Sequence, residues 1–231
     1  MGIVASAASF PYLFYQSMGP WSASIARDWG VTGEAGTIFV FQFTLLAAVV
    51  FICSITGVFL AERYNLPGFG KPRDVYNIVY RYGAPTLLFG MIAGWLLHDH
   101  TFFKVVPLDT GIYLYPRKIL WSATLLLHNS GANELVFRFG VLTLAAGLFR
   151  GKHHYLAVFL TSFFITVLSI RELHFVDYAR MDARVWCCVI WSLLSNVMLG
   201  VVYVRKGLWA AMSLRACLDA RFLLYPVLGM V

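Results

Sequence analysis

The sequence has few charged residues. Only 13% of its 231 residues are Asp, Glu, Lys or Arg, whereas 60% are apolar and the mean hydropathy is +0.73. Soluble domains carry about 25% charged and about 45–50% apolar residues, so this composition excludes an ordinary soluble domain. It predicts an integral, multi-pass protein of a bacterial inner membrane or an organellar membrane. The fold class expected is all-α, a transmembrane helix bundle of about six to seven spans of about 20 residues each.

The sequence also lacks motifs that would hold a metal or a structural disulfide. Its four cysteines lie inside apolar runs and form no Cys-x-x-Cys or Cys/His spacing: Cys53, Cys187, Cys188 and Cys217. Such cysteines are typical of small buried apolar residues. The triplet His98-Asp99-His100 resembles a metal site, but adjacent side chains on a loop diverge. We therefore expect no metal and no cofactor, and we expect this triplet to lie at a hydrated helix end.

Acidic residues are fewer than basic ones, with 11 Asp and Glu against 18 Lys and Arg. Most of the basic residues fall between apolar runs, which is typical of loops beside lipid headgroups. No basic stripe is interleaved with aromatic residues on a polar surface, so nucleic acid is not an expected partner. The expected partners are the lipid bilayer and other membrane protein subunits. Because basic residues occur in loops on both expected sides, the charge rule gives no orientation.

Apolar runs separated by helix breakers predict the individual helices. The clearest span is Thr37 to Ala61, which has 25 residues without a charge. Residues 1–36 are broken by Pro and Gly, which predicts an N-terminal interfacial or re-entrant segment before a transmembrane domain of residues 37–231. The 31 residues from Ile119 to Phe149 fit either one long tilted helix or two segments broken at Gly131. The other runs are Tyr82 to Leu97, Tyr155 to Ile170, Val185 to Val204 and Leu208 to Val231.

Two pairs of charged residues stand out inside these apolar runs. Ionisable groups in a membrane span cost several kcal/mol unless they are paired or hydrated, so they are candidate site residues. Glu134 and Arg138 are four residues apart, and so are Arg215 and Asp219. Each pair therefore shares one face of a helix. The spacing alone fits structural ion pairs that hold helices together inside the bundle.

The segments around these pairs carry a resemblance to a known family. Residues 131–138 read Gly-Ala-Asn-Glu-Leu-Val-Phe-Arg, and Arg215-Ala-Cys-Leu-Asp219 follows a Gly-x-x-Tyr and a basic turn. This order resembles the CPBP family, the CAAX-protease and bacteriocin-processing membrane proteins. In the family's first motif, Glu-Glu-x-x-x-Arg, Glu134 and Arg138 match and Asn133 replaces the first Glu. In its last motif, His-x-x-x-Asn/Asp, Arg215 replaces the His and Asp219 matches.

The family's middle motif, Phe-x-x-x-His, is not matched in full. By position in the helix, Ile165 to Ser169 occupies it, which leaves Ser169 where the histidine belongs. The other register, Ile170 to His174, supplies a histidine five residues later, at the end of the helix. The sequence leaves both registers open.

The resemblance implies an intramembrane endopeptidase in which a Glu and a His activate water without metal, while a His and an Asn or Asp stabilise the oxyanion. In this sequence Asn133 cannot deprotonate water, Ser169 cannot replace an imidazole, and Arg215 is a fixed cation. We therefore expect a degenerate protease site in a pseudoenzyme that serves as a non-catalytic scaffold or accessory subunit of a membrane complex.

Two alternatives remain. The first is an active, metal-independent endopeptidase of the CAAX-protease type, in which Glu134 acts as the base if His174 reaches it. The second is a proton-channel subunit, because Arg138-Phe139-Gly140 is faintly similar to the arginine-bearing helix of ATP synthase subunit a.

Overall fold

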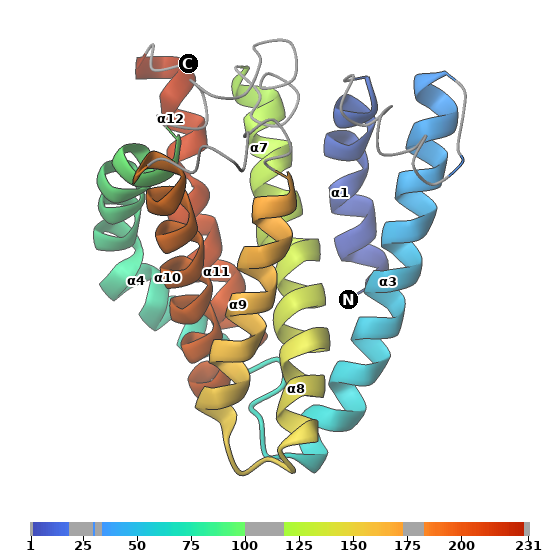
Figure 1. Cartoon of the computed structure of the whole chain (residues 1–231), viewed down its shortest axis with the longest axis vertical. Helices are drawn as coiled ribbons and strands as arrows, with labels where there is room; N and C mark the ends of the chain where they lie inside the picture. The colour runs from blue at the N-terminus through green and yellow to red at the C-terminus, as the bar shows by residue number, and fades with distance from the viewer. Residues whose placement is uncertain (1, 19–29, 31–33, 100–117, 173–182, 229–231) are drawn as a thin grey trace.

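The regular elements of the protein are helices throughout the residues that its computed structural model describes, which are 2–18, 30, 34–99, 118–172 and 183–228. Most of these helices lie roughly along the long axis of the molecule (Figure 1). The predicted all-α class is therefore confirmed for these residues. Among the described helices, two are by length and composition able to cross a membrane: α3 (Ala35–Arg63) and most of α10 (Ala183–Lys206).

The apolar runs correspond to helices, with some changes of boundary. The run that begins at Tyr82 in the sequence analysis belongs to a helix that starts at Pro72, because a proline suits the first helical position and Asp74 lies in the first turn. This helix, α4 (Pro72–Phe89), continues directly into the π-helix η1 (Gly90–Asp99). The run from Tyr155 corresponds to α9 (His154–Glu172).

The long run from Ile119 forms one continuous helical rod. It consists of α7 (Ile119–His128), η2 (Asn129–Asn133), η3 (Leu135–Leu142) and α8 (Thr143–Leu148), with Glu134 in right-handed helical geometry between η2 and η3. The first of the two alternatives is therefore the observed one, and Gly131 does not break the helix. The middle of the rod is wound in wide π turns, which are frequent at functional sites.

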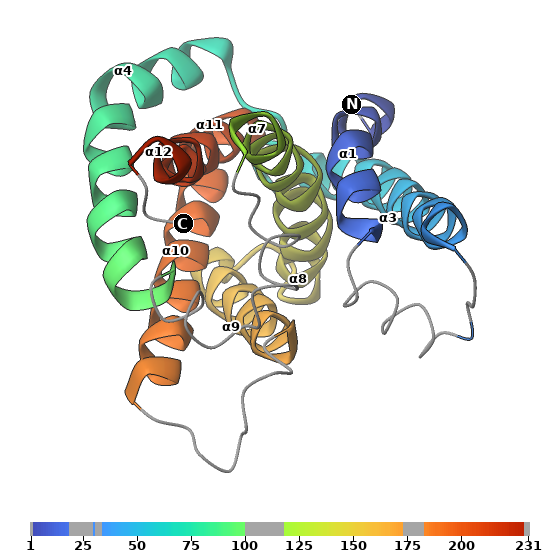
Figure 2. The same ribbon diagram turned by 90° about the horizontal axis from the view of Figure 1, so that it is seen from above.

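The final apolar run is divided into two helices, α11 (Leu208–Asp219) and α12 (Arg221–Leu228), which are separated at Ala220. In Figure 2, which looks along the bundle, α11 and α12 lie between α4 on one side and the rod of α7 and α8 on the other. This arrangement places the last predicted motif, residues 215–219 of α11, beside the first one, residues 133–138 of the rod.

The N-terminal helix α1 (Gly2–Ser17) packs against α3 and α7. Its first residue lies beside the middle of α3, since a Cβ atom on Gly2 would be 2.9 Å from Ser54 Oγ. In Figure 1 α1 accordingly extends along only part of α3. The interfacial or re-entrant character of residues 1–36 stays a prediction.

The helix α3 crosses the central rod at two glycines. A Cβ on Gly140 would lie 2.4 Å from Cys53 Sγ, and a Cβ on Gly57 would lie 2.6 Å from the Phe139 carbonyl oxygen. Small residues of this kind let helix backbones approach closely in membrane bundles. The contact fixes the rod, which carries Glu134 and Arg138, against its neighbour.

Two turns interlock at one end of the bundle. The N–H groups of Leu208 and Trp209 donate to the carbonyl oxygens of Gly68 (2.9 Å) and Phe69 (3.0 Å), so the turn between α3 and α4 satisfies the first donors of α11. Gly207 has φ of 91° and packs on the backbone of Gly70, a conformation that favours glycine at that position.

Candidate functional site

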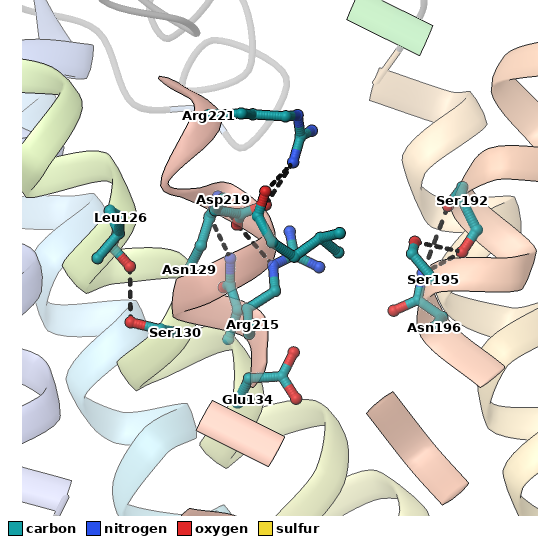
Figure 3. A network of polar contacts seen from close by, with 12 residues as sticks. Leu126, Asn129, Ser130, Glu134, Ser192, Ser195, Asn196, Arg215, Asp219 and Arg221 are labelled. Carbon is teal, nitrogen blue, oxygen red and sulfur yellow. Dashed lines mark hydrogen bonds and ion pairs between the residues drawn. The ribbon is translucent and has the colours of Figure 1, made fainter. Parts of the chain in front are cut away.

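The first and last predicted motifs meet in the interior of the bundle (Figure 3). Asn133 Nδ2 donates to Asn129 Oδ1 (3.0 Å), and Asn129 Nδ2 donates to Asp219 Oδ2 (3.1 Å). These bonds connect η2 with α11 across 90 residues of sequence. The two candidate segments therefore form one site rather than two separate ones.

Asp219 is the centre of this site. Its side chain is 1% exposed and accepts hydrogen bonds from Arg215 Nε (2.6 Å) and from Arg221 Nη1 (3.0 Å), in addition to the bond from Asn129. The predicted pair of Arg215 and Asp219 is therefore confirmed. Three donors take up most of the acceptor positions of one carboxylate.

The network extends to a residue pair that the sequence analysis missed. Arg221 Nε donates to Asp99 Oδ2 (2.7 Å), and the Tyr225 hydroxyl donates to the same oxygen (2.7 Å). Asp99 is 1% exposed, so the expectation of a hydrated helix end is wrong for this residue. The carboxylate is buried because it has a guanidinium and a phenol as partners. The feature of the sequence that could have indicated this pair is Arg221 itself, which is a third charged residue in the last apolar run.

The second predicted pair lies deeper in the rod. Glu134 Oε2 and Arg138 Nε are 3.3 Å apart, with side chains that are 2% and 1% exposed. Neither atom has a hydrogen-bond partner, so the contact between them is ionic rather than a well-aligned hydrogen bond. Arg138 Nη2 donates instead to Asn196 Oδ1 of α10 (2.6 Å). Asn196 in turn donates to the Ser192 carbonyl oxygen (2.8 Å), on the helix drawn at the right of Figure 3.

The two pairs influence each other electrostatically. Arg215 and Asp219 lie close enough to Glu134 for their charges to act on its carboxylate, and Figure 3 shows Glu134 beside Arg215. The ion-pair network, as we call it, thus contains three arginines and three carboxylates: Arg138, Arg215, Arg221, Asp99, Glu134 and Asp219. Its formal charges balance, which is the condition for burying so many ions away from water.

The middle motif contributes no described contact to this network. Ser169 Oγ donates to the Ile165 carbonyl oxygen (3.0 Å), a bond that stays within α9. His174, the alternative residue, lies outside the described residues. Among the described residues, His128 at the end of α7 lies beside the network, because the next residue, Asn129, donates to Asp219. Its Nδ1 atom is buried without a hydrogen-bond partner, and the ring packs 5.0 Å from that of Tyr12.

The arrangement is better suited to holding helices than to activating water. Each carboxylate of the ion-pair network faces a guanidinium that cannot lose its charge in proteins. The ion-pair network joins η1, the central rod, α11 and α12, and the bond from Arg138 to Asn196 connects it to α10. Comparisons with protein-family models, with curated proteins and with solved structures find no match for this chain, and its function is therefore argued from this geometry.

Proposed function

We propose that the chain is a multi-pass membrane protein with a CPBP-like fold and a degenerate protease site, and that it serves as a non-catalytic scaffold or accessory subunit of a membrane complex. One observation carries the proposal: Glu134 is paired with Arg138, and Asp219 is paired with Arg215 and Arg221. A general base needs a carboxylate oxygen that is free to accept a proton from water. These carboxylates are instead neutralised by permanent cations.

The distribution of side chains supports a location in a membrane. Large apolar side chains face outward, as in Phe59 (72% exposed) and Leu148 (78% exposed), while the charged side chains of Arg138 and Asp219 are each 1% exposed. A soluble protein arranges these classes in the opposite way. In a bilayer, apolar side chains face lipid and ionisable groups face the bundle interior, where they pair.

The CPBP-like part of the proposal rests on the order and meeting of the motifs. Asn133 and Glu134 of the first motif come within reach of Arg215 and Asp219 of the last motif through Asn129. An arginine at the position of the family's last histidine supplies a charge that binds Asp219. When an arginine replaces the histidine and pairs with the carboxylate, the residues of a protease site instead connect helices.

One observation favours the alternative, an active endopeptidase. Glu134 Oε2 has no hydrogen-bond partner, so its ionic contact with Arg138 leaves a lone pair that could accept a proton. The proton-channel alternative has less support, because Arg138 is 1% exposed and is paired within its own chain.

The deciding experiment uses the purified full chain in lipid nanodiscs and a fluorogenic prenylated CAAX peptide. We expect no cleavage above background by the wild-type chain or by Glu134→Gln. In parallel, the wild-type chain extracted with mild detergent should migrate on a native gel in one assembly with its partners at fixed stoichiometry.

The matched control is Lys118→Gln, which removes a charge far from the ion-pair network. Cleavage that Glu134→Gln abolishes and Lys118→Gln retains would establish the endopeptidase and refute the scaffold. Migration as a free monomer in the mild extract would also contradict the accessory role.

A further inference from the structure

One end of the bundle is strongly basic. The turns between α3 and α4, between α8 and α9, and between α10 and α11 come together there: His154 Nε2 lies 3.2 Å from the Tyr64 carbonyl oxygen, and Lys206 Nζ lies 3.2 Å from Asp74 Oδ1. Segments 62–74, 149–154 and 204–208, which contain these turns, hold seven Lys and Arg against two carboxylates. All seven cations are exposed: Arg63, Lys71, Arg73, Arg150, Lys152, Arg205 and Lys206.

The segments that follow the opposite ends of the helices are balanced in charge. Residues 18–34, 99–118 and 171–184 together hold seven Lys and Arg and seven Asp and Glu. The described helix ends that flank these segments lie at the other end of the bundle in Figure 1. The excess of positive charge is therefore concentrated at the end where the three turns come together, which we call the basic end. The sequence alone does not reveal this asymmetry, because it does not show which loops share a side of the bundle.

The basic end also has the layered side chains of a membrane boundary. Exposed apolar residues precede the cations along the chain, as Phe59 lies four residues before Arg63 and Leu148 lies two residues before Arg150. Aromatic residues accompany these cations: Arg205 Nε donates to the Tyr155 hydroxyl (3.2 Å), and in the first turns of α4, which begins after Lys71, the rings of Tyr76 and Tyr80 are stacked at 5.6 Å. Tyr and Trp are enriched where acyl chains meet headgroups.

We propose that the basic end binds the anionic phospholipid headgroups of the leaflet that it faces. At the basic end, apolar side chains would contact the acyl chains, aromatic side chains would lie at the interface, and cationic side chains would contact the phosphates. Each Lys or Arg near an anionic leaflet adds to the attraction, which is screened by salt. An acidic protein partner would not require the ring of exposed apolar side chains beside the cations. The proposal rests on the proposed location in a membrane and does not depend on the ion-pair network.

The test compares thermal unfolding of the full chain in nanodiscs of neutral phosphatidylcholine with unfolding in nanodiscs that also contain phosphatidylglycerol. We expect a higher Tm in the anionic discs and a loss of this gain in high salt. In Arg63→Gln/Lys152→Gln the gain should fall by about 2–4 °C for each cation removed. Arg117→Gln/Lys118→Gln removes two cations that lie outside segments 62–74, 149–154 and 204–208 of the sequence, and it should keep the full gain. Inorganic phosphate added to neutral discs should not replace the lipid.

Equal Tm values in both types of disc would overturn the proposal and leave the cations available to an acidic protein. A gain that both double variants lose equally would overturn it too, because the attraction would then be non-specific. Stabilisation by free phosphate in neutral discs would identify a phosphate site instead. If the chain enters neither type of disc, the membrane location is refuted. This outcome differs from equal Tm values in both discs, which would refute only the binding of anionic lipid.

Discussion

Arg221 and Asp99, which are 122 residues apart in the sequence, form a buried ion pair in which Arg221 Nε lies 2.7 Å from Asp99 Oδ2. Their side chains are 4% and 1% exposed. The same guanidinium donates to Asp219 through Nη1 and lies 4.2 Å from the centre of the Phe222 ring. Arg221 thus connects the end of η1 with the candidate site on α11. Asp219 and Phe222 are its neighbours in the sequence, whereas Asp99 is brought to it by the fold.

Replacing this arginine should strongly destabilise the protein. In Arg221→Leu the buried Asp99 carboxylate loses the guanidinium that donates to both of its oxygens, while the hydrogen bond from the Tyr225 hydroxyl remains. Breaking a buried pair in this way costs about 3–5 kcal/mol. Thermal or denaturant unfolding of the purified chain in detergent micelles measures the loss.

The matched control for Arg221→Leu is Lys206→Gln, because Lys206 pairs with Asp74 in an ion pair in which the lysine is 54% exposed. Exposed pairs contribute about 0–1 kcal/mol. Similar losses for the two variants would show that the pair of Arg221 and Asp99 is hydrated rather than buried.

The pair of Glu134 and Arg138 should behave as a coupled unit. Glu134→Gln and Arg138→Met each leave one buried charge behind and should each cost about 3–5 kcal/mol. The double variant removes both charges, so its loss should be smaller than the sum of the two single losses. Neighbours of this kind typically show interaction free energies of about 0.5–3 kcal/mol. Denaturant unfolding of all four chains in the cycle measures this quantity, and strict additivity would mean that the two side chains do not interact.

The parts of the site that were predictable from sequence are those with local spacing. The pairs of Glu134 with Arg138 and of Arg215 with Asp219 follow from a separation of four residues on a helix, which brings side chains together whatever the fold. The helices themselves follow from long apolar runs that end at helix breakers and charged residues. These features depend on neighbours in the chain and on the solvent alone.

The rest depends on tertiary packing. Asn129 reaches Asp219, and Asp99 reaches Arg221, only because separate helices lie side by side. Composition around Asp99 favours a hydrated loop, and its burial depends on partners that are distant in the sequence, such as Arg221 and Tyr225. The π turns around Glu134 have no clear sequence signal either, since they depend on how the rod packs against α1, α3 and α11.

The close crossing of α3 and the central rod predicts a sharp difference between two glycines of the same rod. A Cβ on Gly140 would lie 2.4 Å from Cys53 Sγ, whereas a Cβ on Gly131 would have no neighbour within 4 Å. Gly140→Ala should therefore cost about 1–3 kcal/mol through overpacking. Gly131→Ala should be neutral or should stabilise by about 0.5–1 kcal/mol, because alanine loses less backbone entropy in a helix. Unfolding midpoints of both variants in the same detergent provide the comparison.

A second substitution tests the cause of the expected loss. Cys53→Gly removes the side chain that an alanine at position 140 would meet, so it should recover part of the stability of Gly140→Ala. No recovery would mean that the loss arises from the helix backbone and not from contact with α3.

The charge asymmetry of the bundle predicts its orientation. Loops rich in Lys and Arg remain on the cytoplasmic or matrix side of membrane proteins, so the basic end should face that side. Lys152 and Lys118 are both exposed and flank different ends of the described helices, so Lys152→Cys and Lys118→Cys form a matched pair. A membrane-impermeant maleimide applied to intact cells or sealed organelles should label Lys118→Cys directly and Lys152→Cys only after permeabilisation. The unsubstituted chain, with its four natural cysteines, sets the background. The reverse pattern would show that the basic end lies on the outer side, where the positive-inside rule does not place it.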